Sequence, residues 1–205
     1  ADFYPTTKLT HPHWRSYGLG WFQQDFQGRE IDFHTGSLNG LVAIIGLDRE
    51  GDRAVVVLGN RDHAEMRHAI LWEVMDNRAD ESRRDWNQEI FGLYAALRSE
   101  SEQKWQQTVS QRLKKTHPAL ALDAYTGTYR NERSGDVVVE LADQGLELKT
   151  ALTTMSLSHW QLETFLAEFN PPDVREFGTF RIGTDGTVSA LEVFGETFKR
   201  VQTAE

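Results

Sequence analysis

The sequence predicts an α+β protein, in which an antiparallel sheet with packed helices is followed by a small antiparallel β-barrel. Three observations predict this class. Strand-like apolar runs fill residues 1–60, apolar residues recur at helical spacing over 61–117, and short strand-like runs return over 118–205. We therefore expect three parts, which are a sheet domain over 1–78, a helical connector over 79–118 and a barrel domain over 119–205.

The sheet domain is expected to contain four strands, separated by turns rich in Gly, Asn and Asp. β-branched and aromatic residues are frequent in all four, which cover 17–24, 31–35, 41–48 and 53–59. The last two are almost continuous apolar runs, and such strands are usually covered on both faces. We therefore expect packing partners on each side of this sheet.

Three helical patterns follow the strands. The first starts near Asp62 and Glu65, which have the spacing of a capping box, and runs to Met75. The apolar residues of the other two are Trp86, Ile90, Tyr94 and Leu97, and then Trp105, Val109 and Leu113. Because its apolar stripe is narrow, the third is predicted to be a surface or connecting helix that stops at His117-Pro118.

Seven or eight short strands are expected in the barrel domain, and so many strands in under ninety residues suggest a small antiparallel barrel or sandwich, of which we favour the barrel. Their ranges are 125–130, 136–141, 146–151, 157–163, 164–168, 176–182, 188–193 and 197–201, with Asp185-Gly186 as a hairpin turn. A small barrel fills its own interior. We therefore expect its phenylalanines to be core residues, namely Phe165, Phe169, Phe177, Phe180, Phe194 and Phe198.

Composition and charge exclude several functions. The 205 residues carry 31 acidic against 22 basic side chains, a net charge of −9, and residues 118–205 alone carry −7. Nucleic acid is therefore excluded as a partner, because its phosphates would be repelled. The absence of cysteine excludes disulfides and a cysteine nucleophile. We expect no membrane span, no signal peptide in this chain, no metal and no cofactor.

One short motif carries chemistry. His34-Thr35-Gly36-Ser37 is expected at the end of one strand, just before the turn into the next. It would offer a hydroxyl, an unobstructed backbone edge for an extended substrate, and a free N–H at Ser37 as half of an oxyanion hole. The alternative is that Gly36 and Gly40 simply permit a tight turn, and that His34 is a half-exposed sheet residue.

The order of motifs around this strand resembles a known family. Tyr17-Gly18-Leu19-Gly20-Trp21, the His-Thr-Gly-Ser motif, two apolar strands and a helix follow one another over residues 15–78. This order is similar to the C-terminal part of the catalytic domain in class C β-lactamase-like serine hydrolases, which include penicillin-binding proteins, D-amino-acid peptidases and esterases. The resemblance implies a periplasmic or secreted protein, and a small-molecule or peptide substrate for the complete enzyme.

The resemblance also implies roles for the motif. Thr35 would contact a substrate carboxylate or its equivalent, Gly36 would let the substrate lie close, and the Ser37 N–H would complete the oxyanion hole. His34 stands where true β-lactamases have Lys, which disfavours lactamase activity and leaves peptidase or esterase chemistry more open.

The family also needs a Ser-x-x-Lys helix with the nucleophile and a Tyr-x-Asn loop that moves protons. Both strings occur, as Ser101-Glu102-Gln103-Lys104 and Tyr129-Arg130-Asn131, but they follow the Thr-Gly strand instead of preceding it, so we reject them. We therefore expect no catalytic residue in this chain, no turnover by the chain alone, and self-association through an uncovered apolar face.

The last part resembles the lipocalin-like accessory barrel that often follows this catalytic domain, from Tyr125-Thr126-Gly127-Thr128-Tyr129 onward. The leading hypothesis is thus a C-terminal fragment of a β-lactamase-like hydrolase with its accessory domain. The alternative is a non-catalytic binding or oligomerisation module centred on the barrel.

Overall fold

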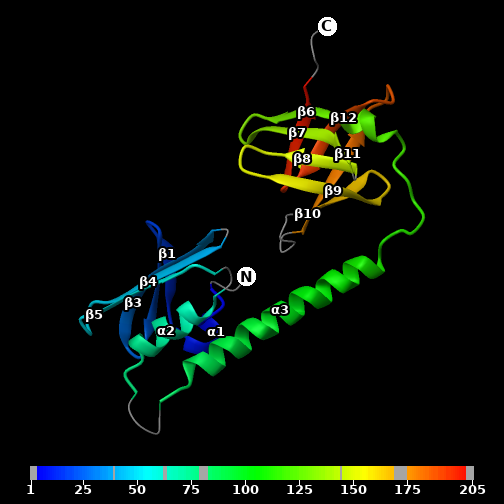
Figure 1. The fold of residues 1–205 in the computed structure, drawn as a ribbon. Helices are drawn as coiled ribbons and strands as arrows, with labels where there is room; N and C mark the ends of the chain where they lie inside the picture. Colours follow the sequence, from blue (N-terminus) through cyan, green and yellow to red (C-terminus); the bar gives the residue numbers. More distant parts are fainter. Residues whose placement is uncertain are drawn as a thin grey trace. The chain divides into compact units, whose positions relative to one another are not determined.

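The computed structural model describes residues 4–38, 40–61, 64–78, 83–143, 145–168 and 175–201. Contacts divide the chain into two compact units, residues 1–106 and 107–205, each of which is described by itself (Figure 1). Both units are built on antiparallel strands, and the helices belong mostly to the first. The three-part division with boundaries after residues 78 and 118 stays a prediction.

The first unit is a five-stranded antiparallel sheet in which the strands follow their sequence order. Its elements are α1 (Thr7–Thr10), β1 (Arg15–Gly18), β2 (Trp21–Phe26), β3 (Arg29–Leu38), β4 (Leu41–Asp48), β5 (Arg53–Gly59), α2 (Met66–Met75) and α3 (Trp86–Ser110). The single strand predicted over 17–24 is wrong. Leu19 and Gly20 have φ values of 52° and 85°, and two left-handed residues form the tight turn that joins β1 to β2.

The sheet has one covered face. Trp72 of α2 and Trp86 of α3 pack with Ile31, Phe33 and Ile44 in one buried cluster, and the Phe33 and Trp72 rings meet edge to face at 5.7 Å. The opposite face exposes apolar side chains, as in Leu41, Val56 and Leu58. Leu58 is 78% exposed. The helices thus cover one face of these strands, and the other is the uncovered apolar face that is expected of this chain alone.

The helices begin and end differently from the prediction. Helix α2 starts at Met66 with Glu65 as its N-cap and without a side-chain capping bond, while Asp62 of the predicted capping box lies outside the described residues. The second helical pattern and the start of the third form one helix, α3, which ends at Ser110, so Leu113 lies outside it and the predicted stop at His117-Pro118 is wrong. Helix α3 continues because the residues between the two patterns are mostly good helix formers such as Arg, Glu, Gln and Lys.

A buried carboxylate joins α2 to the sheet. Asp48, at the end of β4, is fully buried and pairs with Arg29 and with Arg53, whose Nη2 lies 2.7 Å from Asp48 Oδ2. The same two guanidinium groups donate to the carbonyls of Met75 and Val74 at 2.6 and 2.8 Å. One carboxylate thus organises two arginines that bind the C-terminal end of α2.

The second unit contains a closed barrel of eight antiparallel strands, so of the two expected architectures the barrel is confirmed, with the larger of the two expected strand counts. Each strand pairs with its neighbour in sequence, and the last pairs with the first. The strands are β6 (Gly127–Asn131), β7 (Gly135–Ala142), β8 (Gly145–Lys149), β9 (Thr154–Gln161), β10 (Thr164–Glu168), β11 (Arg175–Ile182), β12 (Val188–Val193) and β13 (Glu196–Arg200), preceded by the 3-10 turn η2 (Leu122–Tyr125).

Side chains fill the barrel. Phe165, Phe180 and Phe198 lie in its buried cluster with Tyr125 and Tyr129, as predicted for the phenylalanines. Two other phenylalanines are not core residues, since Phe177 is half-buried and Phe194 is exposed, and Phe169 lies outside the described residues. The buried cluster occupies the interior that a ligand inside the barrel would need.

Candidate functional site

The His34–Ser37 motif lies within a strand. Strand β3 continues to Leu38, and the motif pairs along β4 from His34 opposite Ile45 to Ser37 opposite Val42. The prediction that this strand ends at residue 35 is therefore wrong. Alternation along the strand places His34 and Gly36 on the open face and Thr35 and Ser37 on the face that α2 covers.

The motif has a free backbone edge on its other side. Pairing between β2 and β3 runs from Phe26 opposite Arg29 only as far as Phe22 opposite Phe33. Beyond Phe33, residues 34–38 have no strand partner on that side within the described part of the chain. An extended substrate can pair with such an edge as an added strand.

Gly36 leaves this region open. Its φ is not in the left-handed range, and a Cβ built on it would meet no atom within 4 Å. The backbone therefore has no conformational need for glycine at 36, whereas Gly40, with φ of 80°, occupies the left-handed conformation of a turn. The turn explanation thus fits Gly40, and the glycine at 36 keeps the strand accessible.

A shallow hollow on the open face adjoins the motif. Its lining includes the exposed His34 and Gly36 together with apolar side chains of β4 and β5, such as Ile45, Val56 and Leu58. The hollow joins the free strand edge to the apolar face of the sheet. A substrate or a covering segment that reaches the motif would also contact this apolar surface.

A buried arginine lies behind the motif. Arg67 of α2 is only 7% exposed; its Nε donates to Thr35 Oγ1 at 3.1 Å and its Nη2 donates to Ser37 Oγ at 3.3 Å. Thr35 Oγ1 itself donates to the carbonyl of Ala43 at 2.8 Å. The arrangement fixes both hydroxyls and places a positive charge beneath the strand.

Arg67 was not predicted from the sequence as a site residue, and its neighbour His68, which was expected to be solvated, is buried. Both are polar, and both lie on the buried face of α2. The residues one helical turn later on the same face are the apolar Leu71 and Trp72. A polar side chain on the apolar face of a short helix is a usable signal, because burying it requires specific partners. That signal could have directed attention to α2, although not to the strand that Arg67 contacts.

His68 belongs to a buried polar chain. It is fully buried; its Nε2 lies 2.6 Å from Tyr4 Oη and its Nδ1 lies 3.0 Å from Glu65 Oε2, and Glu65 Oε2 also lies 3.8 Å from Arg67. A neutral imidazole can serve both contacts, with Nδ1–H toward Glu65 and Nε2 accepting from Tyr4. Burial lowers the pKa of His68, although Glu65 opposes this shift.

We expect the first unit to lose stability as the pH falls below about 6.5. The pKa of His68 is lower in the folded chain than the unfolded value of about 6.5. Between these pKa values the unfolded state binds more protons, so the contribution of neutral His68 is complete above pH ~6.5 and is lost as the pH falls.

Hydrogen exchange of the α2 amides across this pH range measures the effect. His68→Gln is expected to flatten the pH dependence. His13→Gln is the matched control, because His13 is exposed and pairs with Asp25 at the surface. An unchanged pH dependence in His68→Gln would contradict the assignment.

Lys104 and Tyr129 of the two rejected strings have structural partners. Lys104 Nζ pairs with Glu100 at 2.7 Å, one turn away on α3, and Ser101 is exposed on the same helix. Tyr129 is buried inside the barrel, where its hydroxyl donates to the carbonyl of Tyr125 at 2.6 Å. Across the described ranges, no three His, Asp or Glu side chains gather as metal ligands would.

Comparison with known proteins gives one family match. A family model described as a domain of unknown function, DUF3471, matches residues 111–204, which is less than half of the chain. No curated protein matches the chain. In the described part, no helix combines the length and the apolar character needed to cross a membrane.

Solved structures with some similarity include SurE with D-Leu, at 20% identity and a TM-score of 0.35 over 91% of this chain. A second SurE structure has 18% identity and a TM-score of 0.35 over 90%. An octameric penicillin-binding protein homologue from Pyrococcus abyssi has 15% identity and a TM-score of 0.26 over 90%. These low scores do not establish a shared fold, and the chain spans only 37–39% of the length of these structures.

Proposed function

We propose that this chain supplies the substrate-binding strand of a β-lactamase-like serine hydrolase of the peptidase or esterase type, whose nucleophile and base come from residues outside this chain. The observation that carries the proposal is the free edge of residues 34–38 with the buried Arg67 guanidinium behind it. A strand segment with only a structural role would not require the hydroxyls of Thr35 and Ser37 to be fixed by a buried arginine.

Each part of the motif has a role in acyl transfer. When an external serine attacks the substrate carbonyl, negative charge develops on the carbonyl oxygen, and the Ser37 N–H would donate to it. Thr35 would bind a carboxylate or an equivalent acceptor of the substrate by turning its O–H from the Ala43 carbonyl toward that acceptor, while Arg67 still donates to Thr35 Oγ1. Gly36 would let the substrate backbone approach, and the apolar hollow would contact the rest of a small-molecule or peptide substrate.

The uncovered face of the sheet fits the same proposal. Leu41, Val56 and Leu58 form an exposed apolar surface next to the motif, and large exposed apolar patches usually mark interaction sites. We infer that the part of the hydrolase that carries the nucleophile covers this face. In its absence, the same surface would promote self-association, and a binding or oligomerisation module centred on the barrel is the alternative function.

We expect the chain alone to hydrolyse no ester and to resist labelling by a fluorescent penicillin or fluorophosphonate. Addition of the segment that carries the Ser-x-x-Lys helix in the parent protein is expected to restore hydrolysis of an activated ester. In that mixture, Gly36→Ala should reduce turnover by about 100-fold, because a methyl group at the free edge displaces the substrate.

Gly92→Ala on α3 is the matched control. At both glycines a Cβ would meet no atom within 4 Å and φ is not left-handed, so both variants are expected to fold. Stoichiometric labelling of Ser101 in the chain alone would overturn the proposal. So would a Gly36→Ala mixture as active as the Gly92→Ala mixture.

A further inference from the structure

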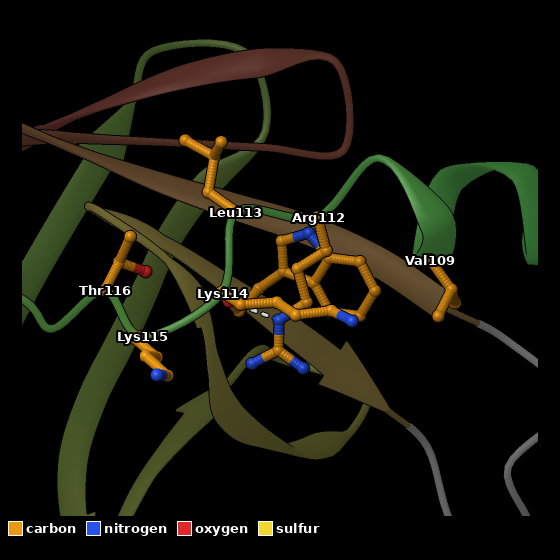
Figure 2. A pocket seen from close by; sticks show the side chains of 7 residues that line it. Val109, Arg112, Leu113, Lys114, Lys115 and Thr116 are labelled. Atoms are coloured by element: carbon orange, nitrogen blue, oxygen red, sulfur yellow. Dashed lines mark hydrogen bonds between the residues drawn. The ribbon is translucent and has the colours of Figure 1, made fainter.

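The barrel presents a candidate ligand site on its outer wall. Its interior is filled by the buried cluster around Tyr129 and Phe165, so a small molecule has no room there. Outside, residues 109–116 cross the end of β9 beside Trp160 and line a hollow of about 370 Å³ (Figure 2). This volume is within the range of small-molecule sites, roughly 300–1,000 Å³.

Hydrogen bonds fix the segment that forms the hollow. Arg112 donates to the carbonyls of Trp160 and His159 at 2.6 and 3.0 Å. The Leu113 N–H donates to Gln161 Oε1 at 2.7 Å, and the Leu162 N–H donates to Thr116 Oγ1 at 3.2 Å. The segment is therefore held on the wall from both sides, and the hollow is formed before any ligand arrives.

Part of the lining of the hollow is apolar. Val109, Leu113 and Trp160 line it, and Leu113 remains 52% exposed. The Arg112 guanidinium lies over the Trp160 ring, 4.5 Å from its centroid, and fixes the ring in place. An exposed leucine next to a fixed aromatic side chain offers contact area to an apolar group.

The lining also includes cationic side chains, in an otherwise acidic domain. Four basic side chains of the barrel domain are paired with carboxylates, as Arg130–Asp136, Arg133–Glu196, Lys149–Glu140 and Arg181–Glu192. Lys114 and Lys115, which line the hollow, have no carboxylate within 4.0 Å among the residues that the structure describes. Residues 118–205 carry −7, so these two lysines form a local positive surface.

We propose that this hollow binds a small amphipathic carboxylate, with its apolar body against Leu113 and Val109 and its charge on Lys114 and Lys115. The apolar lining residues favour burial of a hydrocarbon or aromatic group. The unpaired lysines favour an anion and disfavour a neutral or cationic ligand of the same shape. The site is independent of the hydrolase proposal, because it uses only residues of the second unit.

Titration of the full chain with 1-naphthaleneacetate at low ionic strength, followed by amide chemical shifts, tests the proposal. We expect saturable shifts concentrated at residues 113–116 and 160–162, and at least tenfold weaker binding of the neutral 1-naphthaleneacetamide. Lys114→Met/Lys115→Met should weaken carboxylate binding at least tenfold, and added salt should weaken it in the native chain.

Lys149→Met/Lys199→Met is the matched control, because it removes the same charge from barrel strands away from the hollow, and it should retain binding within twofold. Equal binding of the acid and the amide would overturn the proposal. It would also be overturned by shifts spread over the whole surface, by the absence of binding, or by an equal loss of affinity in the two double variants.

Discussion

Replacement of Asp48 by alanine is expected to destabilise the first unit by about 3–5 kcal/mol, the cost of breaking a buried ion pair by removing one partner. The variant would leave Arg29 and Arg53 without their shared carboxylate. It would also release the two guanidinium groups from the geometry that binds the Val74 and Met75 carbonyls. The expected result is loss of the contact between the sheet and the end of α2.

Hydrogen exchange resolved by unit is the appropriate measurement, because a chain with two compact units does not follow a single two-state transition. Amides of β4 and α2 should lose protection in Asp48→Ala, while amides of the barrel keep theirs. Glu50→Ala, in the exposed turn after β4, is the control and should change stability by less than about 0.5 kcal/mol. Equal effects of the two substitutions would refute the prediction.

The same carboxylate makes the first unit sensitive to acid. Burial alone would raise the pKa of Asp48, but the Gly51 N–H, the bonds from Arg53 and the charges of Arg29 and Arg53 outweigh it and lower the pKa. The stability that Asp48 contributes is therefore present above its unfolded pKa of about 3.9. It is lost as the pH falls through the lower folded pKa, and Asp48→Ala should lose less stability over that range.

Replacement of Tyr129 by alanine is expected to destabilise the barrel by about 3–5 kcal/mol, as for other large aromatic residues removed from a core. Tyr129 is fully buried, packs 5.8 Å from the Phe180 ring and lies beneath the Arg200 guanidinium. Burial also raises the pKa of Tyr129 to about 12, so its hydroxyl stays protonated and donates to the Tyr125 carbonyl.

Tyr129→Phe separates the ring from the hydroxyl. It keeps the packing and removes only the bond to Tyr125, so it should cost about 1 kcal/mol. Urea unfolding followed by exchange of the barrel amides measures both variants. If Tyr129→Phe costs as much as Tyr129→Ala, the hydroxyl and not the packed ring stabilises the barrel, and the prediction fails.

The sequence predicted structure best where a local pattern is sufficient. The eight barrel strands follow from short apolar runs and turn residues, and the closed barrel contains all of them. Two local features were missed. The run 17–24 contains the left-handed residue Leu19, which strand propensity does not anticipate, and α3 continues through polar residues that carry no apolar period.

The candidate site was predicted only in part. The motif itself could be found because its four residues are consecutive. Arg67 is 32 positions from Thr35, and Tyr4 is 64 positions from His68. These contacts depend on how α2 packs on the sheet, which no local pattern specifies, so the charge beneath the strand and its buried partners became apparent only in the structure.

At position 36, the stability of the fold and access of a substrate to the strand edge favour different residues. Alanine would fit there without strain, and it would restrict the unfolded chain more than glycine does, which stabilises the fold. The glycine at 36 thus makes the folded chain less stable than it could be. If Gly36→Ala melts at a higher temperature and yet impairs the complemented enzyme, the residue trades stability for activity, as residues at functional sites commonly do.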